Sequence, residues 1–373
     1  MDKILELKKL TDRTNLNLIN KKLILKNCKT LYNIYKKIKP FWKKISSKHN
    51  FINKTTDTYN EIFNIFENSF IMEYKCVKNE ISKIINIIKL ENSNITFYYF
   101  NIGNYHNDIE LINLLFSETV CLAKYSNVYE RENIIVIWFP ISKNRDFNYD
   151  IINDENLQKS ADNFNAFTVS GLTYGNSPRI TIITRYEEIS KLLLHELIHN
   201  FNLDGSNFHK HNHLLIKNYK NIKNPKILSK QNYEYEYSIY ESYTELLSSY
   251  LNIIFRHIEL ETSKILIQRY FIEILFEIFY SYNTVANLII LNGYSDYNEF
   301  IYKPIFKGNI CIYEYYFLKA LLYNNYELKL CYNETEFLNN YNDIINVNKQ
   351  DPLLINIYNN MYKQTNFKYN LYD

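Results

Sequence analysis

Two histidines and a glutamate stand close together in the segment KLLLHELIHNF at 191–201, where His195, Glu196 and His199 form the pattern HExxH. On an α-helix, residues four apart project about 40° from each other, so both imidazoles can bind one metal ion. Zinc is the natural ion, because it accepts nitrogen ligands tetrahedrally and lowers the pKa of its water to about 7. Glu196 projects about 100° from His195. From there its carboxylate can take a proton from zinc-bound water and pass it to a leaving amine.

The alternative is that both histidines lie on the surface of an ordinary amphipathic helix. Such a helix usually carries Lys and Glu on its solvent face, whereas this one carries a histidine, a glutamate and a histidine. The apolar residues fill one continuous arc of about 140° on the helical wheel. The helix therefore commits one face to a core and leaves the other for a site. The residues of the apolar arc are Leu193, Leu194, Leu197, Ile198 and Phe201.

A zinc hydrolase needs a third protein ligand and keeps its fourth position for water. The arrangement HExxHxxGxxH is excluded, because Asn202 and Gly205 occupy the positions of its glycine and its third histidine. We interpret Asp204-Gly205 as the stop and turn after the helix.

The next strongly helical segment, SIYESYTELLSSYLN at 238–252, holds Glu241 and Glu245 four residues apart. Both lie on a narrow polar stripe, within about 40° of each other, while the rest of that helix is apolar. Such a stripe is what a buried helix that faces a metal site needs. One carboxylate would bind zinc, and the other could accept the free N–H of a ligand histidine. The alternative is a stripe that faces water.

With these two segments together, the chain resembles the zincin metallopeptidases, in the group whose third ligand is a glutamate, such as thermolysin and neprilysin. In those families HExxH is followed on a later helix by ExxxD, and YESYTEL is similar to that motif with Glu in place of Asp. The resemblance implies that Glu241 is the zinc ligand and that Glu245 supports a histidine. The segment at 170–199 is also similar to zincin-like proteins encoded by large DNA viruses, and the resemblance covers residues 76–256.

In the zincin fold, the strand before the active-site helix is an edge strand that pairs with an extended peptide substrate. The run ITIIT at 180–184 stands in that place. The resemblance therefore implies a substrate-binding edge strand made of Ile180, Thr181, Ile182, Ile183 and Thr184.

Around these motifs, apolar β-prone runs alternate with helical patterns, which predicts a mixed α/β layer. We expect strands at 95–100, 134–139 and 180–184, and helices at 77–90, 109–125, 187–202 and 238–256. The fold class is then α+β and predominantly helical, with a small mixed sheet. The predicted organisation is a helical N-terminal region at 1–75, a zincin-like catalytic domain at 76–258 and a helical C-terminal region at 259–373.

Composition excludes several classes of function. The 373 residues carry 43 Lys and Arg against 40 Asp and Glu, a net charge of +3, which offers no basic patch for nucleic acid or a membrane surface. The 5 cysteines form no CxxC pair, and we expect no secretory signal, because the N-terminus lacks a continuous apolar stretch. No stretch is apolar enough to span a membrane. We expect an intracellular, cytoplasmic protein, in the host cytoplasm or the virion if it is viral, and the sequence leaves its oligomeric state open.

These observations predict a zinc-dependent metallopeptidase that hydrolyses peptide bonds of a peptide or protein substrate. Zn²⁺ is the expected cofactor, with His195, His199 and Glu241 as ligands and Glu196 as the general base. The alternative is a non-catalytic interaction or virion protein that keeps a zincin scaffold, with zinc structural or absent. Glu196 favours the enzyme, because a purely structural site needs no general base and closes its fourth position with protein.

Overall fold

The computed structural model of the chain falls into two compact units. One unit runs from Tyr35 to Leu203, and the other combines Met1–Ile34 with Asp204–Asp373. These limits do not coincide with the predicted boundaries at 75 and 258, and one of them falls inside the helix α2 (Lys21–Trp42). The structure describes residues 16–45, 48–52, 83–102, 109–141, 171–174, 178–186, 188–204, 239–260, 262–291, 293–302, 313–328, 344 and 350–369.

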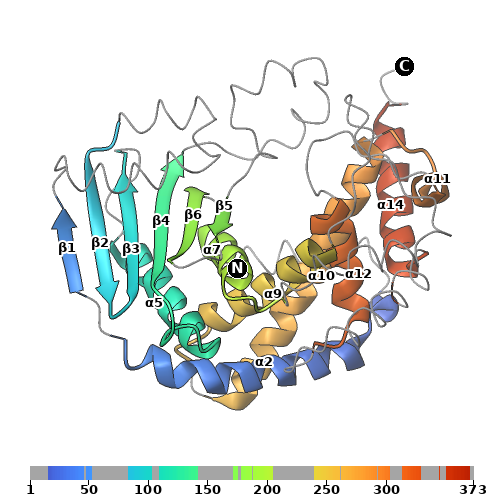
Figure 1. Cartoon of the computed structure of the whole chain (residues 1–373). Helices are drawn as coiled ribbons and strands as arrows, with labels where there is room; N and C mark the ends of the chain where they lie inside the picture. Colours follow the sequence, from blue (N-terminus) through green and yellow to red (C-terminus); the bar gives the residue numbers. More distant parts are fainter. Residues whose placement is uncertain are drawn as a thin grey trace, which may run out of the picture. The chain divides into compact units, whose positions relative to one another are not determined.

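A mixed sheet of six strands is the centre of the unit Tyr35–Leu203 (Figure 1). The strand order is β1-β2-β3-β4-β6-β5. β3, β4 and β6 run parallel to one another, whereas β1, β2 and β5 pair antiparallel with their neighbours. The strands are β1 (Lys48–Ile52), β2 (Asn86–Asn92), β3 (Ile95–Asn101), β4 (Ile134–Ile141), β5 (Gly171–Tyr174) and β6 (Arg179–Arg185).

The three apolar runs predicted as strands are confirmed as β3, β4 and β6. Consecutive residues of these strands are buried, as at Ile182 and Ile183. Adjacent side chains of a strand point to opposite faces, so burial of both shows that β6 is covered on both sides. A continuous apolar run is what such an inner strand requires.

The predicted helix at 77–90 is wrong for residues 86–90, which belong to β2; residues 77–82 of that prediction lie outside the described part of the chain. β2 and β3 form a hairpin in which Asn92 pairs with Ile95, leaving Ser93 and Asn94 as the turn. Ser93 has φ 53°, the left-handed conformation that two-residue hairpin turns need. The Asn-Ser-Asn turn signal at 92–94 outweighs the helical spacing of the apolar residues before it.

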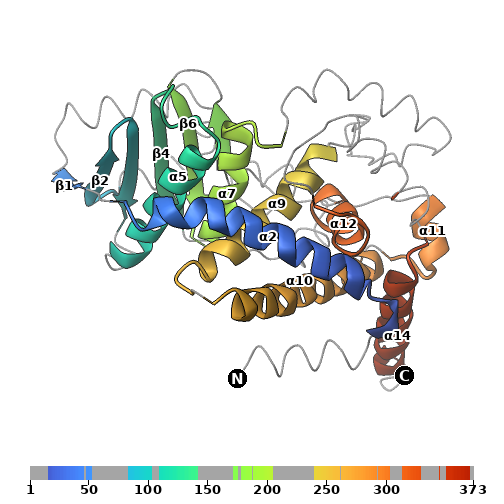
Figure 2. The ribbon, with the colours of Figure 1, turned by 90° about the horizontal axis from the view of Figure 1, so that it is seen from below.

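Two helices of the same unit, α5 (Ile109–Tyr125) and α7 (Ile189–Asn200), lie side by side on one face of the sheet (Figure 2). α7 packs against β5 and β6, and it carries the HExxH pattern. The helices predicted at 109–125 and 187–202 are therefore confirmed, the second with slightly shorter bounds. This packing fixes the position of α7 relative to the sheet.

The described secondary-structure elements of the second unit are all helices. Its long helix α10 packs against α9, α12 and α14, and α9 also contacts α12 and a π-helical segment, η7. α9 confirms the helix predicted at 238–256. The elements of this unit beyond α2 are η1 (Leu16–Leu18), α9 (Ile239–Arg256), α10 (Ser263–Leu291), α11 (Tyr297–Tyr302), η7 (Tyr313–Leu318), α12 (Lys319–Asn325) and α14 (Pro352–Tyr369).

A buried asparagine of α2 helps to fix α9 within this unit. The Asn27 side-chain amide donates to Tyr250 Oη at 3.2 Å and to the Tyr326 carbonyl at 3.1 Å. Its side-chain oxygen accepts from the Leu328 amide at 2.9 Å. Because Asn27 is fully buried, these three bonds satisfy a polar group that would otherwise destabilise the core.

The fold class is α+β and predominantly helical, with a mixed sheet, as the sequence predicted. In the described ranges, no helix has the length and apolar character that crossing a membrane requires.

Candidate metal centre

The helix α7 ends in a way that differs from the sequence interpretation. Its last residue is Asn200, and Asn202 adopts a left-handed conformation with φ 55°. The Leu203 amide donates to the Ile198 carbonyl at 2.9 Å, and the Asn202 amide donates to the His199 carbonyl at 3.1 Å. This pair of bonds is the Schellman motif, with Asn in the place that Gly usually takes. The interpretation of Asp204-Gly205 as the helix stop was therefore wrong, and the stop lies at Asn202.

His195 and His199 lie one turn apart on α7, and the Nε2 atoms of their two rings face each other. Their Nε2 atoms are 3.2 Å apart, and the two rings are inclined at 80°. Two nitrogens that bind one zinc ion tetrahedrally at 2.0–2.1 Å are separated by about 3.3 Å. The pair therefore already has the spacing that a shared zinc ion requires, and imidazole nitrogen is a donor that zinc prefers.

The helix holds this pair rigidly because its apolar residues are committed to the core. Leu193, Leu194, Leu197 and Ile198 are all buried, as the helical wheel predicted. His195 and Glu196 are largely buried as well, with exposed fractions of 5% and 9%. His195 and Glu196 are thus not solvated surface side chains, and the alternative of two surface histidines is wrong for His195.

The C-terminal end of α7 is fixed to the sheet by a buried polar network. The guanidinium of Arg179 donates to the carbonyl of Asn200, the last residue of α7. The same guanidinium forms two hydrogen bonds with Glu132, at 2.6 and 2.9 Å, which lower the pKa of that carboxyl. The Asn200 amide donates to Thr181 Oγ1 at 2.6 Å. His195 and His199 therefore stand on a helix whose C-terminal end is held by β6.

Glu196 is held from β5, by residues that the sequence interpretation missed. The Thr173 hydroxyl lies 2.8 Å from Glu196 Oε2 and 3.1 Å from the Glu196 carbonyl oxygen. A methyl group on Gly171 would lie 2.6 Å from Glu196 Cγ, so this glycine leaves the space that the glutamate occupies. A glycine inside a strand often marks such a close approach. That signal was present in the sequence at Gly171.

The predicted substrate-binding edge strand was wrong in its position. Ile180–Thr184 belongs to β6, which pairs with β4 on one side and with β5 on the other. Its backbone groups are already used in these ladders and cannot pair with a peptide. In the described sheet, the strand at the end of the order next to α7 is β5, four residues long and antiparallel to β6.

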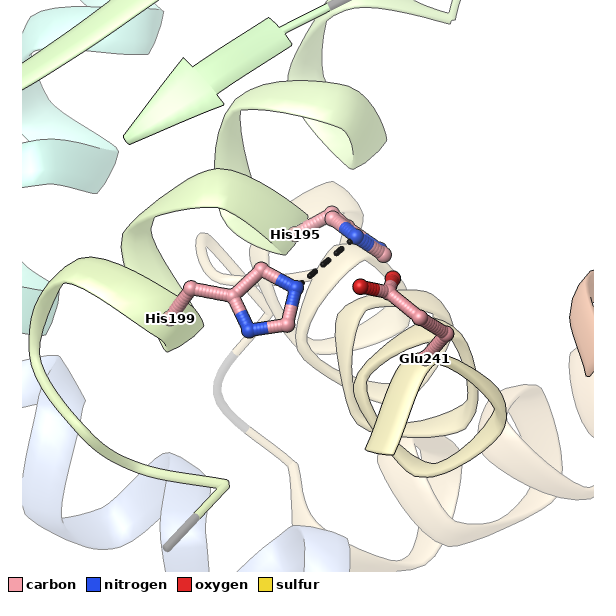
Figure 3. A group of neighbouring side chains, drawn as sticks. All are labelled: His195, His199 and Glu241. Carbon is pink, nitrogen blue, oxygen red and sulfur yellow. Dashed lines mark hydrogen bonds between the residues drawn. The ribbon is translucent and has the colours of Figure 1, made fainter. Parts of the chain in front are cut away.

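Glu241 stands in the first turn of α9. One carboxylate oxygen of Glu241 and one ring nitrogen each of His195 and His199 all lie within 4.8 Å of one another (Figure 3). A metal ion is held by three or more histidine, cysteine, aspartate or glutamate side chains that lie close together. Within the described part of the chain, these three residues are the group with that spacing. Two imidazole nitrogens and one carboxylate oxygen are a donor set suited to zinc.

Glu245, one turn further along α9, has a cationic partner. Its Oε2 lies 3.5 Å from Nζ of Lys319, the first residue of α12. The Lys319 side chain is 3% exposed and also lies over the Tyr316 ring, at 5.7 Å from its centroid. A nearly buried ammonium needs a carboxylate beside it. The Glu245 carboxylate therefore serves as the counter-charge of Lys319. The prediction that Glu245 supports a ligand histidine is not tested by this contact and stays a prediction.

Behind α7, a buried carboxyl of α5 connects the two helices. Glu118 Oε1 accepts a hydrogen bond from the Ser190 hydroxyl, at 2.7 Å, in the first turn of α7. Burial raises the pKa of Glu118 from 4.5 to about 8, and the bond from Ser190 lowers it only in part. Glu118 is therefore protonated in the folded protein at neutral pH.

This raised pKa predicts a pH-dependent stability. The folded protein binds the Glu118 proton more tightly than the unfolded chain, so its stabilising contribution is complete below pH 4.5 and is lost as pH rises to about 8. Replacing Glu118 by Gln should leave stability nearly unchanged at about pH 4 and raise it by roughly 3–5 kcal/mol relative to the wild type at about pH 8.5. Urea unfolding in the presence of a chelator measures this. Glu110→Gln, at an exposed position of α5, is the control and should show no such dependence.

Comparison with known proteins gives no relative for this chain. No family model, no curated protein and no solved structure matches it. The functional argument therefore rests on the site itself.

Proposed function

We propose that the protein is a zinc-dependent peptidase, and the observation that carries this proposal is the pair of Nε2 atoms of His195 and His199 at 3.2 Å. The spacing suits one tetrahedral zinc ion. Glu196 stands next to His195 on the same helix, with its carboxylate held by a hydrogen bond. A metal-binding histidine pair with a fixed neighbouring carboxylate is what metal-assisted hydrolysis requires.

In this proposal His195, His199 and Glu241 hold the ion. Zinc, when bound, supplies a Lewis acid for the scissile carbonyl and lowers the pKa of water. Glu196 accepts a proton from the attacking water and passes it to the leaving amine, so that water is added across the peptide bond and an acid and an amine are released. Because Glu245 is paired with Lys319, Glu241 is the carboxylate of α9 that we assign to the metal.

The donor set favours an enzyme over a structural zinc site. A structural site is closed by four protein ligands, whereas a catalytic site has three and keeps one position for water or substrate. Within the described residues, the candidate group has three members, His195, His199 and Glu241. A general base such as Glu196 would also have no purpose in a purely structural site.

We further propose a zincin-type arrangement in which β5 aligns the substrate. The parallel strand β6 leads directly into α7, and the antiparallel strand β5 ends the described sheet beside that helix. An extended peptide can add to such a strand through backbone hydrogen bonds, with its scissile bond near Glu196. The sequence interpretation assigned substrate pairing to residues 180–184, and we now assign it to β5, residues 171–174.

An intracellular location fits this proposal. Cys28 and Cys121 are both buried free thiols, and burial raises their pKa to about 12. Thiols in this state are unreactive, and unpaired cysteines are typical of proteins in a reducing compartment.

The proposal is tested by metal analysis together with digestion of a peptide library. Purified protein, stripped with a chelator and dialysed against zinc, should retain one zinc ion per chain and should cleave peptides that the stripped protein leaves intact. Cleavage products identified by mass spectrometry would also give the sequence preference. Retained zinc without cleavage of any peptide would favour the alternative, a non-catalytic zincin scaffold for interaction or virion assembly. Failure to retain zinc would contradict the proposal that the protein is a zinc enzyme.

A further inference from the structure

We infer that β5 positions the general base: Gly171 leaves the space for the Glu196 side chain, and Thr173 fixes its carboxylate. This inference rests on the proposed function, because it assigns the catalytic proton transfer to Glu196. Gly171 and Thr173 are positioning residues, since they act through Glu196. Both lie on the same face of β5, two residues apart, and that face is the one toward α7.

The contact at Gly171 shows how closely the strand and the glutamate approach. A Cβ added to Gly171 would lie 2.6 Å from Glu196 Cγ, 2.6 Å from Oε1 and 2.7 Å from Cδ. These atoms include the base of the side chain, so the clash is not relieved by rotating its last bond. Gly171 pairs with Ile183 in the ladder and has no left-handed backbone angle. The three atoms that a larger residue would meet first all belong to Glu196.

The contact at Thr173 orients the carboxylate. The Thr173 hydroxyl has one proton, and its shorter contact is to Glu196 Oε2 at 2.8 Å, against 3.1 Å to the Glu196 carbonyl oxygen. A hydrogen bond donated to a carboxylate is stronger than one donated to a neutral carbonyl. Oε2 is thus engaged by β5, while Oε1 lies over Gly171. The carboxylate has one orientation, which proton transfer over hydrogen-bond distance requires.

A merely structural role for these residues makes a different prediction. If Thr173 only joins β5 to the backbone of α7, its hydroxyl matters equally with or without the Glu196 side chain. If Gly171 is required only by the strand, an alanine there is equally harmful in every background. Double-mutant cycles with Glu196→Ala separate the two cases, because that substitution removes Cγ and the carboxylate and leaves the carbonyl.

The first experiment measures thermal unfolding of the full chain, without zinc and without substrate. Gly171→Ala should lower the apparent Tm by about 4 °C, as expected for overpacking a tight contact. In the Glu196→Ala background the same substitution should lower it by about 1 °C or less. Thr173→Val should also lose most of its effect in that background. Equal shifts with and without the Glu196 side chain would overturn the inference.

The second experiment measures zinc affinity and steady-state hydrolysis of a peptide that the library digestion yields. Gly171→Ala should bind zinc within about threefold of the wild type but lose about 100-fold in kcat, because a displacement near 1 Å of a catalytic group has that effect. Thr173→Val should lose about tenfold in kcat with KM unchanged, and Thr173→Ser should restore most of it. Thr96→Val, on β3, is the control for replacing a threonine hydroxyl by a methyl group within the sheet.

The two experiments keep this inference separate from the proposed function. Absence of zinc or of hydrolysis in the wild type would contradict the proposed function. The contact between β5 and Glu196 would then be tested by the double-mutant cycles of thermal unfolding alone. Coupled stability with an unchanged kcat in both variants would overturn the positioning role while leaving the peptidase intact. If Gly171→Ala does not fold, the Thr173 variants decide the outcome alone.

Discussion

Glu196→Gln should retain one zinc ion per chain and lose hydrolysis by a factor of about 10²–10⁴ in kcat. Gln keeps the size of the side chain and still accepts the hydrogen bond from the Thr173 hydroxyl, but it cannot take a proton from water. A positioned general base contributes a factor of this size. The measurement is steady-state kinetics on the peptide that the wild type cleaves, with zinc content determined on the same preparation.

The control for this variant is Glu188→Gln, an exposed glutamate just before α7. It should keep both zinc and activity. Glu196→Gln with full activity would remove Glu196 from the mechanism, whatever the metal content. A loss of zinc in Glu196→Gln would show that Glu196 acts as a ligand and would equally contradict its assignment as the base.

Glu241→Gln and Glu245→Gln should differ sharply in their effect on zinc affinity. If Glu241 is the third ligand, Glu241→Gln should weaken zinc binding by more than about 100-fold, beyond the 10–100-fold loss typical of changing a partner of a ligand. Glu245→Gln should weaken it by about tenfold or less. A competition titration against a chromophoric chelator measures both affinities. The two residues lie one turn apart on α9, so each variant is a matched control for the other.

The same two variants should also differ in their free energy of unfolding, and here Glu245→Gln should have the larger effect. Glu245→Gln leaves the 3% exposed Lys319 without the carboxylate 3.5 Å from its Nζ, and breaking a buried ion pair costs about 3–5 kcal/mol. Glu241→Gln, measured without metal, should cost less. A stronger zinc defect in Glu245→Gln than in Glu241→Gln would exchange the two roles.

The sequence was sufficient for the elements that carry a local pattern. His195 and His199 sit where the period of a helix places them, and the apolar runs at 95–100, 134–139 and 180–184 are strands. These features depend on neighbours three or four residues away, or on alternate residues of a strand. Local spacing was therefore enough to find the candidate metal ligands of α7.

The parts that sequence reasoning missed depend on contacts between distant segments. β5 has four residues and too little pattern to be seen, so the edge position was given to β6. The contacts of Thr173 and Gly171 with Glu196 and the ion pair of Glu245 with Lys319 follow from packing. Residues 86–90 of β2 were predicted as the end of a helix because their apolar residues also fit helical spacing, and the hairpin turn at Ser93 is the feature that favours a strand.

The most direct test of the central claim is a crystal structure of the zinc-loaded protein, with anomalous data collected at the zinc absorption edge. The account predicts one strong anomalous peak at about 2.0–2.1 Å from a ring nitrogen of His195 and of His199 and about 2.0–2.2 Å from a carboxylate oxygen of Glu241. The fourth position should hold solvent within hydrogen-bond distance of Glu196. A peak bound elsewhere, no peak, or a fourth protein ligand in place of solvent would contradict the claim that this is a catalytic zinc centre.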